Sequence, residues 1–322
     1  MFGTECNRVF LKEMGMTTYQ EEGRLKEAVK SLACKDGLQL MCHMRMGCEP
    51  LPSEPMIKEL IGLCRSLLFP GFFGDADVNG YNLEYAIGLQ CERLKNVLEN
   101  QIVAGMLVTA RDVCADEHTR IEESASRIAI DFIAKLPELR RVLHTDVSAI
   151  FRGDPAATST SEVIYCYPGI KAIINYRIAH ELLIVGVPVI PRMITESAHS
   201  ETGIDIHPGA VIGEYFAIDH GTGVVIGETA IIGRNVKLYQ GVTLGARSFP
   251  TDENDNLIKG IPRHPIIGDN VIIYSNATIL GRITIGDNAV VGGNIWVTAD
   301  VPQGERLIQA KSKQHTKIER DE

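Results

Sequence analysis

The hydrophobic positions of this chain follow two different periods, and the change falls near residue 200. Up to that point apolar residues recur with the three- and four-residue spacing of amphipathic helices. Ser53 and Pro55 open one such segment, and the stretch LFPGFFG ends it. Asn82 is the expected N-cap of a second helix that runs to about Met106. Further helices are predicted over residues 120–136, 138–151 and 168–186.

After Gly203 the hydrophobic period becomes six residues, which fits neither the 3.6-residue turn of a helix nor the two-residue alternation of a strand. The series is interrupted twice, by two extra residues after His220 and by the segment 246–265. Seven of the aliphatic residues are followed directly by glycine, at positions 213, 227, 233, 245, 268, 286 and 292. Thirteen hexads begin with an aliphatic residue, namely Ile206, Ile212, Ile218, Ile226, Ile232, Leu238, Leu244, Ile267, Ile273, Ile279, Ile285, Val291 and Val297.

A fixed period of six residues is typical of a parallel β-helix, here expected to be left-handed. Each hexad should form one short strand with its aliphatic side chain inside, while glycine permits the backbone of the corner. Three hexads would close one 18-residue triangular coil, with successive coils ~4.8 Å apart. Asn276 and Asn294 are eighteen residues apart and should therefore lie one above the other.

The predicted fold class is thus α+β. An N-terminal α-helical domain over residues 1–200 precedes a C-terminal left-handed parallel β-helix of hexapeptide repeats over residues 201–302. The segment 246–265 is an inserted loop of this β-helix, and residues 303–322 form a C-terminal tail.

Composition and charge exclude several classes of function. The net charge of −9 is spread along the chain without a basic stripe, which argues against nucleic acid or an anionic membrane as a partner. The longest apolar stretch, residues 182–190, is much shorter than the roughly 20 residues that cross a bilayer. The N-terminus lacks the pattern of a secretory signal, and all eight cysteines precede residue 167, which fits reduced thiols. A cytoplasmic protein is expected. Cys42, His43 and Cys48 are read as part of a frayed amphipathic helix in preference to a metal site.

The two interruptions of the repeat are where chemistry is expected. Loops longer than about 12–15 residues are usually functional or disordered, and this one ends with Arg263 and His264 side by side. The other interruption directly follows Asp219 and His220. A histidine can accept a proton from a hydroxyl near neutral pH, and a carboxylate on its other ring nitrogen would orient it.

Several of these stretches resemble one family of enzymes. IDIHPGAVIG, IDHGTGVVIGETAIIG, GVTLG and RHP in the repeat, together with RGDPAA and NYRIAH before it, are similar to serine O-acetyltransferases. LPSEPMIKEL and LFPGFFG resemble the longer N-terminal region of one bacterial subgroup. The resemblance implies transfer of an acetyl group from acetyl-CoA, the co-substrate, to the hydroxyl of L-serine, giving O-acetylserine for cysteine biosynthesis. No metal is required, and the hydroxyl attacks the thioester directly.

The resemblance also assigns roles to individual residues. His220 becomes the general base and Asp205 its orienting partner. The amino group of serine falls to Asp154 and Asp219, and its carboxylate to Arg263. The other implied contacts are His264, Gly245 and Ala246 for the substrate, and Thr243, Gly245, Ala277 and Ile295 for acetyl-CoA.

In the family the sites form between subunits, so at least a homotrimer is implied, with pairing of two trimers left open. The helical domain would serve oligomerisation and part of the substrate site, and L-cysteine is the implied feedback inhibitor. Ala246 replaces a usual glycine, and the region after Pro302 lacks the usual Gly-x-Pro-Ala turn. The chain ends in Arg320-Asp321-Glu322, and such an acidic end predicts no C-terminal complex with cysteine synthase.

Alternatives remain open at this stage. A hexapeptide O-acetyltransferase for a sugar or another small hydroxyl acceptor would share His220 and CoA without needing two carboxylates and an arginine. A zinc lyase needs three imidazoles on one metal, usually with two close in sequence, and the histidines of the repeat form no such pair. A silent scaffold would have no reason to keep the interruption. His207 is read as a corner residue, His180 as a packed or capping residue, and Glu228 is undecided between substrate contact and solvated strand.

Overall fold

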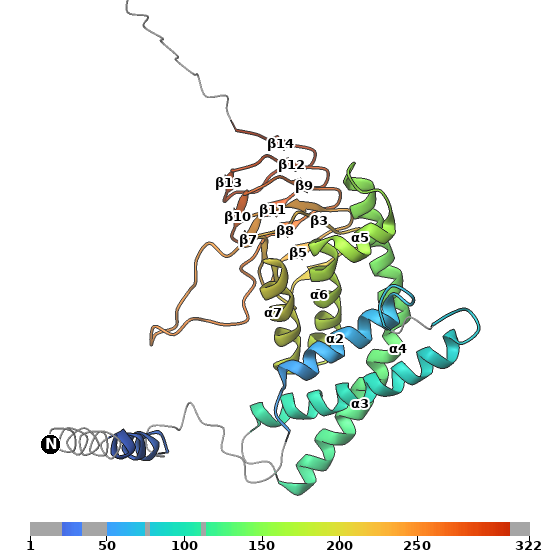
Figure 1. Cartoon of the computed structure of the whole chain (residues 1–322). Coiled ribbons are helices and arrows are strands. Elements are labelled where there is room, and N and C mark those ends of the chain that lie inside the picture. The colour runs from blue at the N-terminus through green and yellow to red at the C-terminus, as the bar shows by residue number, and fades with distance from the viewer. Residues whose placement is uncertain (1–20, 34–49, 75–77, 111–113, 310–322) are drawn as a thin grey trace, which may run out of the picture. The chain divides into compact units, whose positions relative to one another are not determined.

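The structure is a computed structural model that describes residues 21–33, 50–74, 78–110 and 114–309. The chain divides into two compact units, Met1–Glu49 and Pro50–Glu322. In the first unit, residues 21–32 form a helix whose residues are all exposed. Cys42, His43, Cys48 and the acidic C-terminus lie outside the described residues. All elements discussed below belong to the second unit (Figure 1).

Among the described residues of the second unit, six helices precede the repeat region. They are α2 (Glu54–Leu68), α3 (Leu83–Thr109), α4 (Ala115–Gly153), α5 (Thr160–Cys166), α6 (Pro168–Ile184) and α7 (Ile190–Thr202). The predicted starts at Ser53 and Asn82 are confirmed as N-caps, and α6 begins at Pro168 as expected.

The predicted break between residues 136 and 138 is wrong, because α4 runs through Pro137 as one helix. A proline inside a helix removes a hydrogen bond and costs about 3 kcal/mol. Here one buried stripe continues on both sides of it, through Phe132, Leu136, Leu139 and Leu143. Packing of that stripe offsets the cost, which a reading of local signals alone misses.

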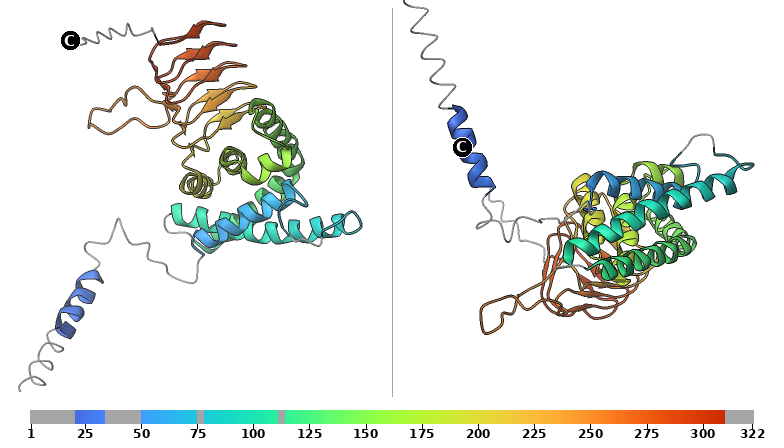
Figure 2. Two further views of the ribbon diagram at one scale, coloured as in Figure 1. Left: turned by 45° about the horizontal axis from the view of Figure 1, so that its top comes forward. Right: turned by 90° about the horizontal axis from the view of Figure 1, so that it is seen from below.

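The second half is a solenoid of three parallel sheets (Figure 2). In spatial order the sheets are β1-β4-β7-β10-β13, β11-β8-β5-β2 and β14-β12-β9-β6-β3. The strands are β1 (Asp205–Ile206), β2 (Val211–Ile212), β3 (Ala217–Asp219), β4 (Val225–Ile226), β5 (Ile231–Ile232), β6 (Lys237–Tyr239), β7 (Thr243–Gly245), β8 (Ile266–Ile267), β9 (Ile272–Ile273), β10 (Thr278–Leu280), β11 (Thr284–Ile285), β12 (Val290–Val291), β13 (Trp296–Val297) and β14 (Arg306–Leu307). Helices followed by a parallel β-solenoid confirm the predicted fold class.

The strand register confirms the 18-residue coil and places both interruptions. Val225 pairs with Thr243, eighteen residues on, and Thr278 pairs with Trp296 at the same interval. The first pairing joins Asp205 to Val225, an interval lengthened by the two residues after His220. Asn276 lies above Asn294 as predicted, and its Nδ2 donates to the Asn294 Oδ1 at 3.3 Å.

All thirteen aliphatic positions are buried, none of them more than 7% exposed. The prediction that the glycines after these residues adopt the corner backbone is wrong, because none of them has a positive φ. Left-handed corner backbone occurs instead at asparagines such as Asn235, Asn270 and Asn288. The glycines are needed because the next coil passes too closely: a Cβ on Gly213 would lie 2.6 Å from the carbonyl oxygen of Gly233.

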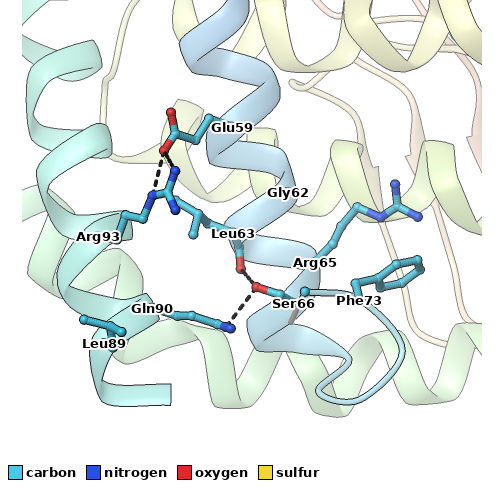
Figure 3. A pocket seen from close by; sticks show the side chains of 10 residues that line it. Glu59, Gly62, Leu63, Arg65, Ser66, Phe73, Leu89, Gln90 and Arg93 are labelled. Atoms are coloured by element: carbon cyan, nitrogen blue, oxygen red, sulfur yellow. Dashed lines mark hydrogen bonds and ion pairs between the residues drawn. The ribbon is translucent and has the colours of Figure 1, made fainter. Parts of the chain in front are cut away.

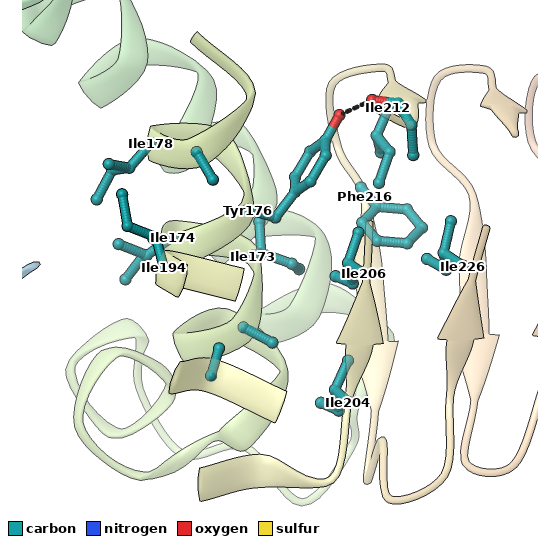
Figure 4. Packing of buried hydrophobic residues seen from close by; sticks show 14 of the residues in the cluster. Ile173, Ile174, Tyr176, Ile178, Ile194, Ile204, Ile206, Ile212, Phe216 and Ile226 are labelled. Atoms are coloured by element: carbon teal, nitrogen blue, oxygen red, sulfur yellow. Dashed lines mark hydrogen bonds between the residues drawn. The ribbon is translucent and has the colours of Figure 1, made fainter. Parts of the chain in front are cut away.

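The stretch NYRIAH on α6 fastens the helices to the first coil. The Tyr176 hydroxyl donates to the carbonyl oxygen of Ala210 at 2.6 Å, and the Nδ1 of His180 lies 2.8 Å from that of Pro208. Arg177 forms a buried ion pair with Asp146 of α4, at 2.6 Å. In Figure 4, Tyr176 and Ile173 of α6 face Ile206 and Phe216 of the first coil. His180 is therefore a packing residue, as read from the sequence, and the first coil is held in place relative to α4.

Candidate active site

His220 occupies an unusual backbone position at the corner between β3 and β4. Its φ is 57°, and that of Gly221 is 95°. Left-handed backbone is uncommon outside glycine, although histidine is among the residues enriched there. The turn presents the imidazole outward, with 73% of the side chain exposed and its Nε2 3.8 Å from the Asp219 Oδ1. An accessible ring beside a carboxylate is suited to exchanging protons with a bound molecule.

Asp154 comes to the same corner from the end of α4, where it is the C-cap. Its Oδ2 accepts a hydrogen bond from the Tyr167 hydroxyl at 2.6 Å, and its Oδ1 accepts one from the Ala156 N–H at 2.8 Å. These two bonds lower the pKa of Asp154, with the charges of Lys237 and His220 adding to the effect. The hydrogen bond to Asp154 in turn raises the pKa of Tyr167 to about 12. Asp154 is therefore a fixed carboxylate that stays ionised.

Lys237 on β6 links the segments that carry the two aspartates. Its Nζ lies 2.8 Å from the Asp219 Oδ2 and donates to the Gly153 carbonyl oxygen at 2.7 Å. It also lies 4.4 Å from the ring centroid of Tyr239. Burial lowers the pKa of Lys237, but hydrogen bonds to Asp219 and Tyr239 outweigh it and leave that pKa raised.

The sequence reasoning missed Lys237 and Tyr167. For Lys237 a signal was present, since it stands in the strand next to that of Asp219 once the two-residue insertion is counted. For Tyr167 no comparable signal existed, because its contact with Asp154 depends on how α4 and α5 pack.

Arg263 and His264 lie directly before β8, where the inserted loop rejoins the solenoid, and they contact Thr229 at the next corner, between β4 and β5. The Nδ1 of His264 accepts a hydrogen bond from the Thr229 N–H at 3.0 Å. Burial, and next the charge of Arg263, lower the pKa of His264 to about 4. The ring is thus neutral at pH 7 with its proton on Nε2, which makes that atom a hydrogen-bond donor.

Glu228 sits beside this pair, and whether it contacts the substrate stays undecided. Its Oε2 lies 2.6 Å from a terminal guanidinium nitrogen of Arg263. The loop end is fixed further by Arg282, whose guanidinium donates to the carbonyl oxygens of Thr229 at 2.6 Å and His264 at 3.0 Å. Glu228 is therefore an ion-pair partner of Arg263 in this chain, and not a free solvated residue.

Asp205 begins β1 on the face between these two corners. Its Oδ1 lies 3.9 Å from Arg192 of α7, and its carboxylate also approaches Glu196 and His199. Arg192 already contacts Glu196 at 2.5 Å, so a guanidinium supplies the positive charge in this cluster. Within the part of the chain that the structure describes, no hydrogen bond or ion pair joins Asp205 to His220. The predicted pairing of the two is therefore not made inside one chain and stays a prediction.

His207 takes the role of a corner residue. Its Nδ1 accepts a hydrogen bond from the Gly209 N–H at 3.0 Å. Burial, and next the charge of Arg192, lower its pKa. Both features fit the structural reading made from the sequence.

The residues assigned to acetyl-CoA come together in one sheet. The Thr243 N–H donates to the carbonyl oxygen of Ala277 at 3.0 Å, and the Thr278 N–H donates to that of Ile295 at 2.8 Å. Gly245 closes β7, and Ala246 opens the inserted loop next to it. The predicted positions thus form a continuous strip along β7, β10 and β13, and their role in binding acetyl-CoA stays a prediction.

A separate hollow lies among the helices. A cavity of about 400 Å³ opens between α2 and α3, where Arg93 pairs with Glu59 and Ser66 contacts Gln90 (Figure 3). None of the predicted site residues lines it.

None of the described helices is long and apolar enough to span a membrane.

A parallel solenoid of hexads that carries an exposed histidine beside a carboxylate at one corner defines the class of hexapeptide-repeat acyltransferases. In agreement, the family described as bacterial transferase hexapeptide (six repeats) matches residues 264–294.

The particular family follows from longer matches. The chain is 48% identical over 264 residues to a plasmid-encoded serine acetyltransferase of Synechococcus elongatus, covering 81% of this chain and 83% of that protein. It is 42% identical to the Helicobacter pylori (strain J99) serine acetyltransferase, over 54% of this chain and 97% of the other. The crystal structure of Entamoeba histolytica serine acetyltransferase 1 with L-cysteine is similar at a TM-score of 0.67 and 39% identity, covering 78% and 86% of the two chains. The chain belongs to the serine acetyltransferase family, which confirms the resemblance seen in its motifs.

Proposed function

We propose that this protein transfers the acetyl group of acetyl-CoA to the hydroxyl of L-serine, giving O-acetylserine and free CoA. Membership of the serine acetyltransferase family supports the reaction. The observation that carries the assignment of residues is the corner at His220, where an exposed imidazole meets Asp219 and Asp154.

In the proposed mechanism His220 acts as the general base. Its imidazole removes the proton of the serine hydroxyl while the oxygen attacks the thioester carbonyl carbon. The tetrahedral intermediate then collapses, the C–S bond breaks, and the imidazolium returns the proton to the CoA thiolate. No cysteine occurs after residue 166, so the solenoid offers no thiol for an acyl-enzyme, which supports direct attack.

Recognition of serine is proposed to use both corners. The ammonium group binds between Asp154 and Asp219, whose segments Lys237 links through the Gly153 carbonyl oxygen and the Asp219 Oδ2. The carboxylate binds Arg263, with the Nε2–H of His264 as a second donor. A neutral His264 supplies a hydrogen bond without adding a second charge, and its low pKa keeps it neutral at working pH.

The two corners belong to one active site only if two chains meet. Asp205 and His220 make no contact within the described part of one chain, and Arg263 lies at a different corner from His220. We therefore propose that Asp205, Arg263 and His264 of one copy face Asp154, Asp219 and His220 of the next copy in a homotrimer.

L-Cysteine is proposed to compete for the same site. It differs from serine only at the side-chain heteroatom, so it presents the same ammonium and carboxylate groups. The Entamoeba histolytica enzyme, similar in structure, has been crystallised with L-cysteine. We also propose that the enzyme acts in the cytoplasm, where it would use acetyl-CoA and serine.

Release of CoA from acetyl-CoA tests the reaction, measured with a panel of acceptors on wild type and on His220→Ala. L-Serine should be the best acceptor, and the variant should lose most of its rate. A sugar that reacts while serine does not would favour the alternative of a different hydroxyl acceptor. Full activity of His220→Ala would refute the mechanism.

Mixed assembly tests the shared site. His220→Ala and Arg263→Ala are each expected to be nearly inactive alone. After the two are unfolded together and refolded, some interfaces contain both wild-type halves, so activity should reappear. No recovery from chains that reassemble would place the whole site within one chain.

A further inference from the structure

We infer that Lys237 is a positioning residue for amino-group recognition, because it fixes Asp219 and the backbone that presents Asp154 at one distance from His220. This inference rests on the proposed function, in which the two aspartates bind the substrate ammonium. It adds a residue to which neither the motifs nor the family resemblance assigned a role.

The contacts of Lys237 join two segments that are far apart in sequence. One bond reaches the Asp219 Oδ2 at 2.8 Å, and the other reaches the carbonyl oxygen of Gly153 at 2.7 Å. Gly153 is the last residue of α4, directly before Asp154. A single ammonium therefore ties the end of a helix to a strand of the solenoid, between the two candidate ligands of the substrate.

The lysine is held firmly enough to act as a spacer. Its side chain is only 16% exposed, and its Nζ lies over the ring of Tyr239. A Cβ on Gly153 would lie 3.5 Å from the Nζ and 3.6 Å from the Cδ of Lys237, so the helix end packs directly on the lysine stem. A partly buried ammonium with two hydrogen-bond acceptors has little freedom to move, and this rigidity passes to both neighbours.

The arrangement also sets which oxygen of Asp219 remains for the substrate. Lys237 occupies Oδ2, which leaves Oδ1 on the side of His220, 3.8 Å from its Nε2. Asp154 is fixed in a similar way, by Tyr167 on its Oδ2. The carboxylates are thus aimed before any substrate binds, which reduces the entropy lost on binding.

The charges of the group match one substrate ammonium. Asp154 and Asp219 contribute two negative charges, and Lys237 contributes one positive charge. The remaining single negative charge is neutralised by the one ammonium of an α-amino acid, in a partly buried setting where unpaired charge is costly.

Steady-state kinetics of Lys237→Met test the inference. The KM for L-serine should rise about tenfold, which corresponds to ~1.4 kcal/mol, while the KM for acetyl-CoA and the melting temperature stay near wild type. The inhibition constant of L-cysteine should rise by the same factor. Lys237→Arg keeps the charge and both donors, so it should recover most of the affinity for serine. Lys95→Met is the matched control, since Lys95 pairs with Glu99 on a helix remote from this corner.

Two results would overturn the inference. One is an unchanged or lower KM for serine in Lys237→Met, which would mean that the lysine merely competes with the substrate. The other is an equal loss of affinity for both substrates together with lower thermal stability, which would mean a structural role. Asp219→Asn separates these from a failure of the proposed function. If that variant binds serine normally, the assignment of the ammonium site is wrong. If it binds poorly while Lys237→Met does not, only the role of the lysine is wrong.

Discussion

The ion pair that joins α4, α6 and the first coil should be essential for stability, and Arg177→Met tests this. The guanidinium donates to Asp146 at 2.6 and 3.0 Å, and to the carbonyl oxygens of Ile212 and Gly213 at 3.3 and 2.8 Å. Asp146 is fully buried, and once the arginine is gone its only remaining hydrogen-bond donor among the described residues is the Phe216 N–H. Removing one partner of a buried pair typically costs about 3–5 kcal/mol, because it leaves an uncompensated charge inside the protein.

That magnitude translates into a melting temperature lower by roughly 5–8 °C, at ~1.5 °C per kcal/mol for 322 residues with an unfolding entropy of ~2.1 cal/mol/K per residue. The deficit should also depend on pH. Burial raises the pKa of Asp146, and Arg177 opposes that rise. In the variant the rise is unopposed, so the folded state retains a proton that the unfolded chain releases above its carboxyl pKa of about 3.9. The variant should therefore come closest to wild type at low pH and fall further behind as pH increases toward neutrality.

Thermal unfolding of Arg177→Met between pH 4.5 and 8 provides the measurement. Arg141→Met is the control. Arg141 also lies on α4 and forms ion pairs, with Glu138 of the same helix and with Glu214 of the first coil, but its side chain is exposed. Exposed pairs contribute about 0–1 kcal/mol, so the control should change little. A small, pH-independent loss in Arg177→Met would refute the reasoning, since it would mean that the pair is not a desolvated charge pair.

Three further predictions concern the second corner and the solenoid. Gly227→Ala places a Cβ 2.0 Å from the Cδ2 of His264, so the imidazole must move and the KM for serine should rise. Gly62→Ala is the control, because a Cβ there would have nothing within 4 Å, and it should leave the kinetics unchanged. His264 has a folded pKa of about 4, below an unfolded value near 6.5, so its contribution to the unfolding free energy is complete above pH 6.5 and is lost as pH falls toward 4. Denaturant titrations at pH 7 and 4.5 should show a smaller difference in His264→Gln than in wild type. Asn276→Ala should lower the unfolding free energy by about 1 kcal/mol, because φ is 58° there, and Asn276→Gly should cost less; equal losses would contradict this.

The sequence was enough to predict the solenoid, because a six-residue period is set by the interior of the coil and every hexad repeats it. It also located the two breaks in the period, after His220 and at the loop before Arg263, where a role in catalysis stays a prediction. It was not enough to predict the contacts of Lys237, Tyr167 and Glu228. Those depend on where helix ends pack against strands, and no local pattern encodes that packing. The predicted helix break at Pro137 was wrong for the same reason, because packing of the buried stripe outweighs the local helix-breaking effect of proline.

The position of the two insertions has a consequence for how this scaffold changes. The extra residues after His220 lengthen the interval between paired residues by the same amount in all three sheets. Asp205 pairs with Val225, Val211 with Ile231 and Ala217 with Lys237. A corner can therefore lengthen without disturbing the pairing of any strand above it. Length variation at corners is nearly neutral for folding, whereas a single residue gained inside a strand would turn its interior side chains outward. New acceptor specificities are accessible on this solenoid by lengthening corners, with the core left intact.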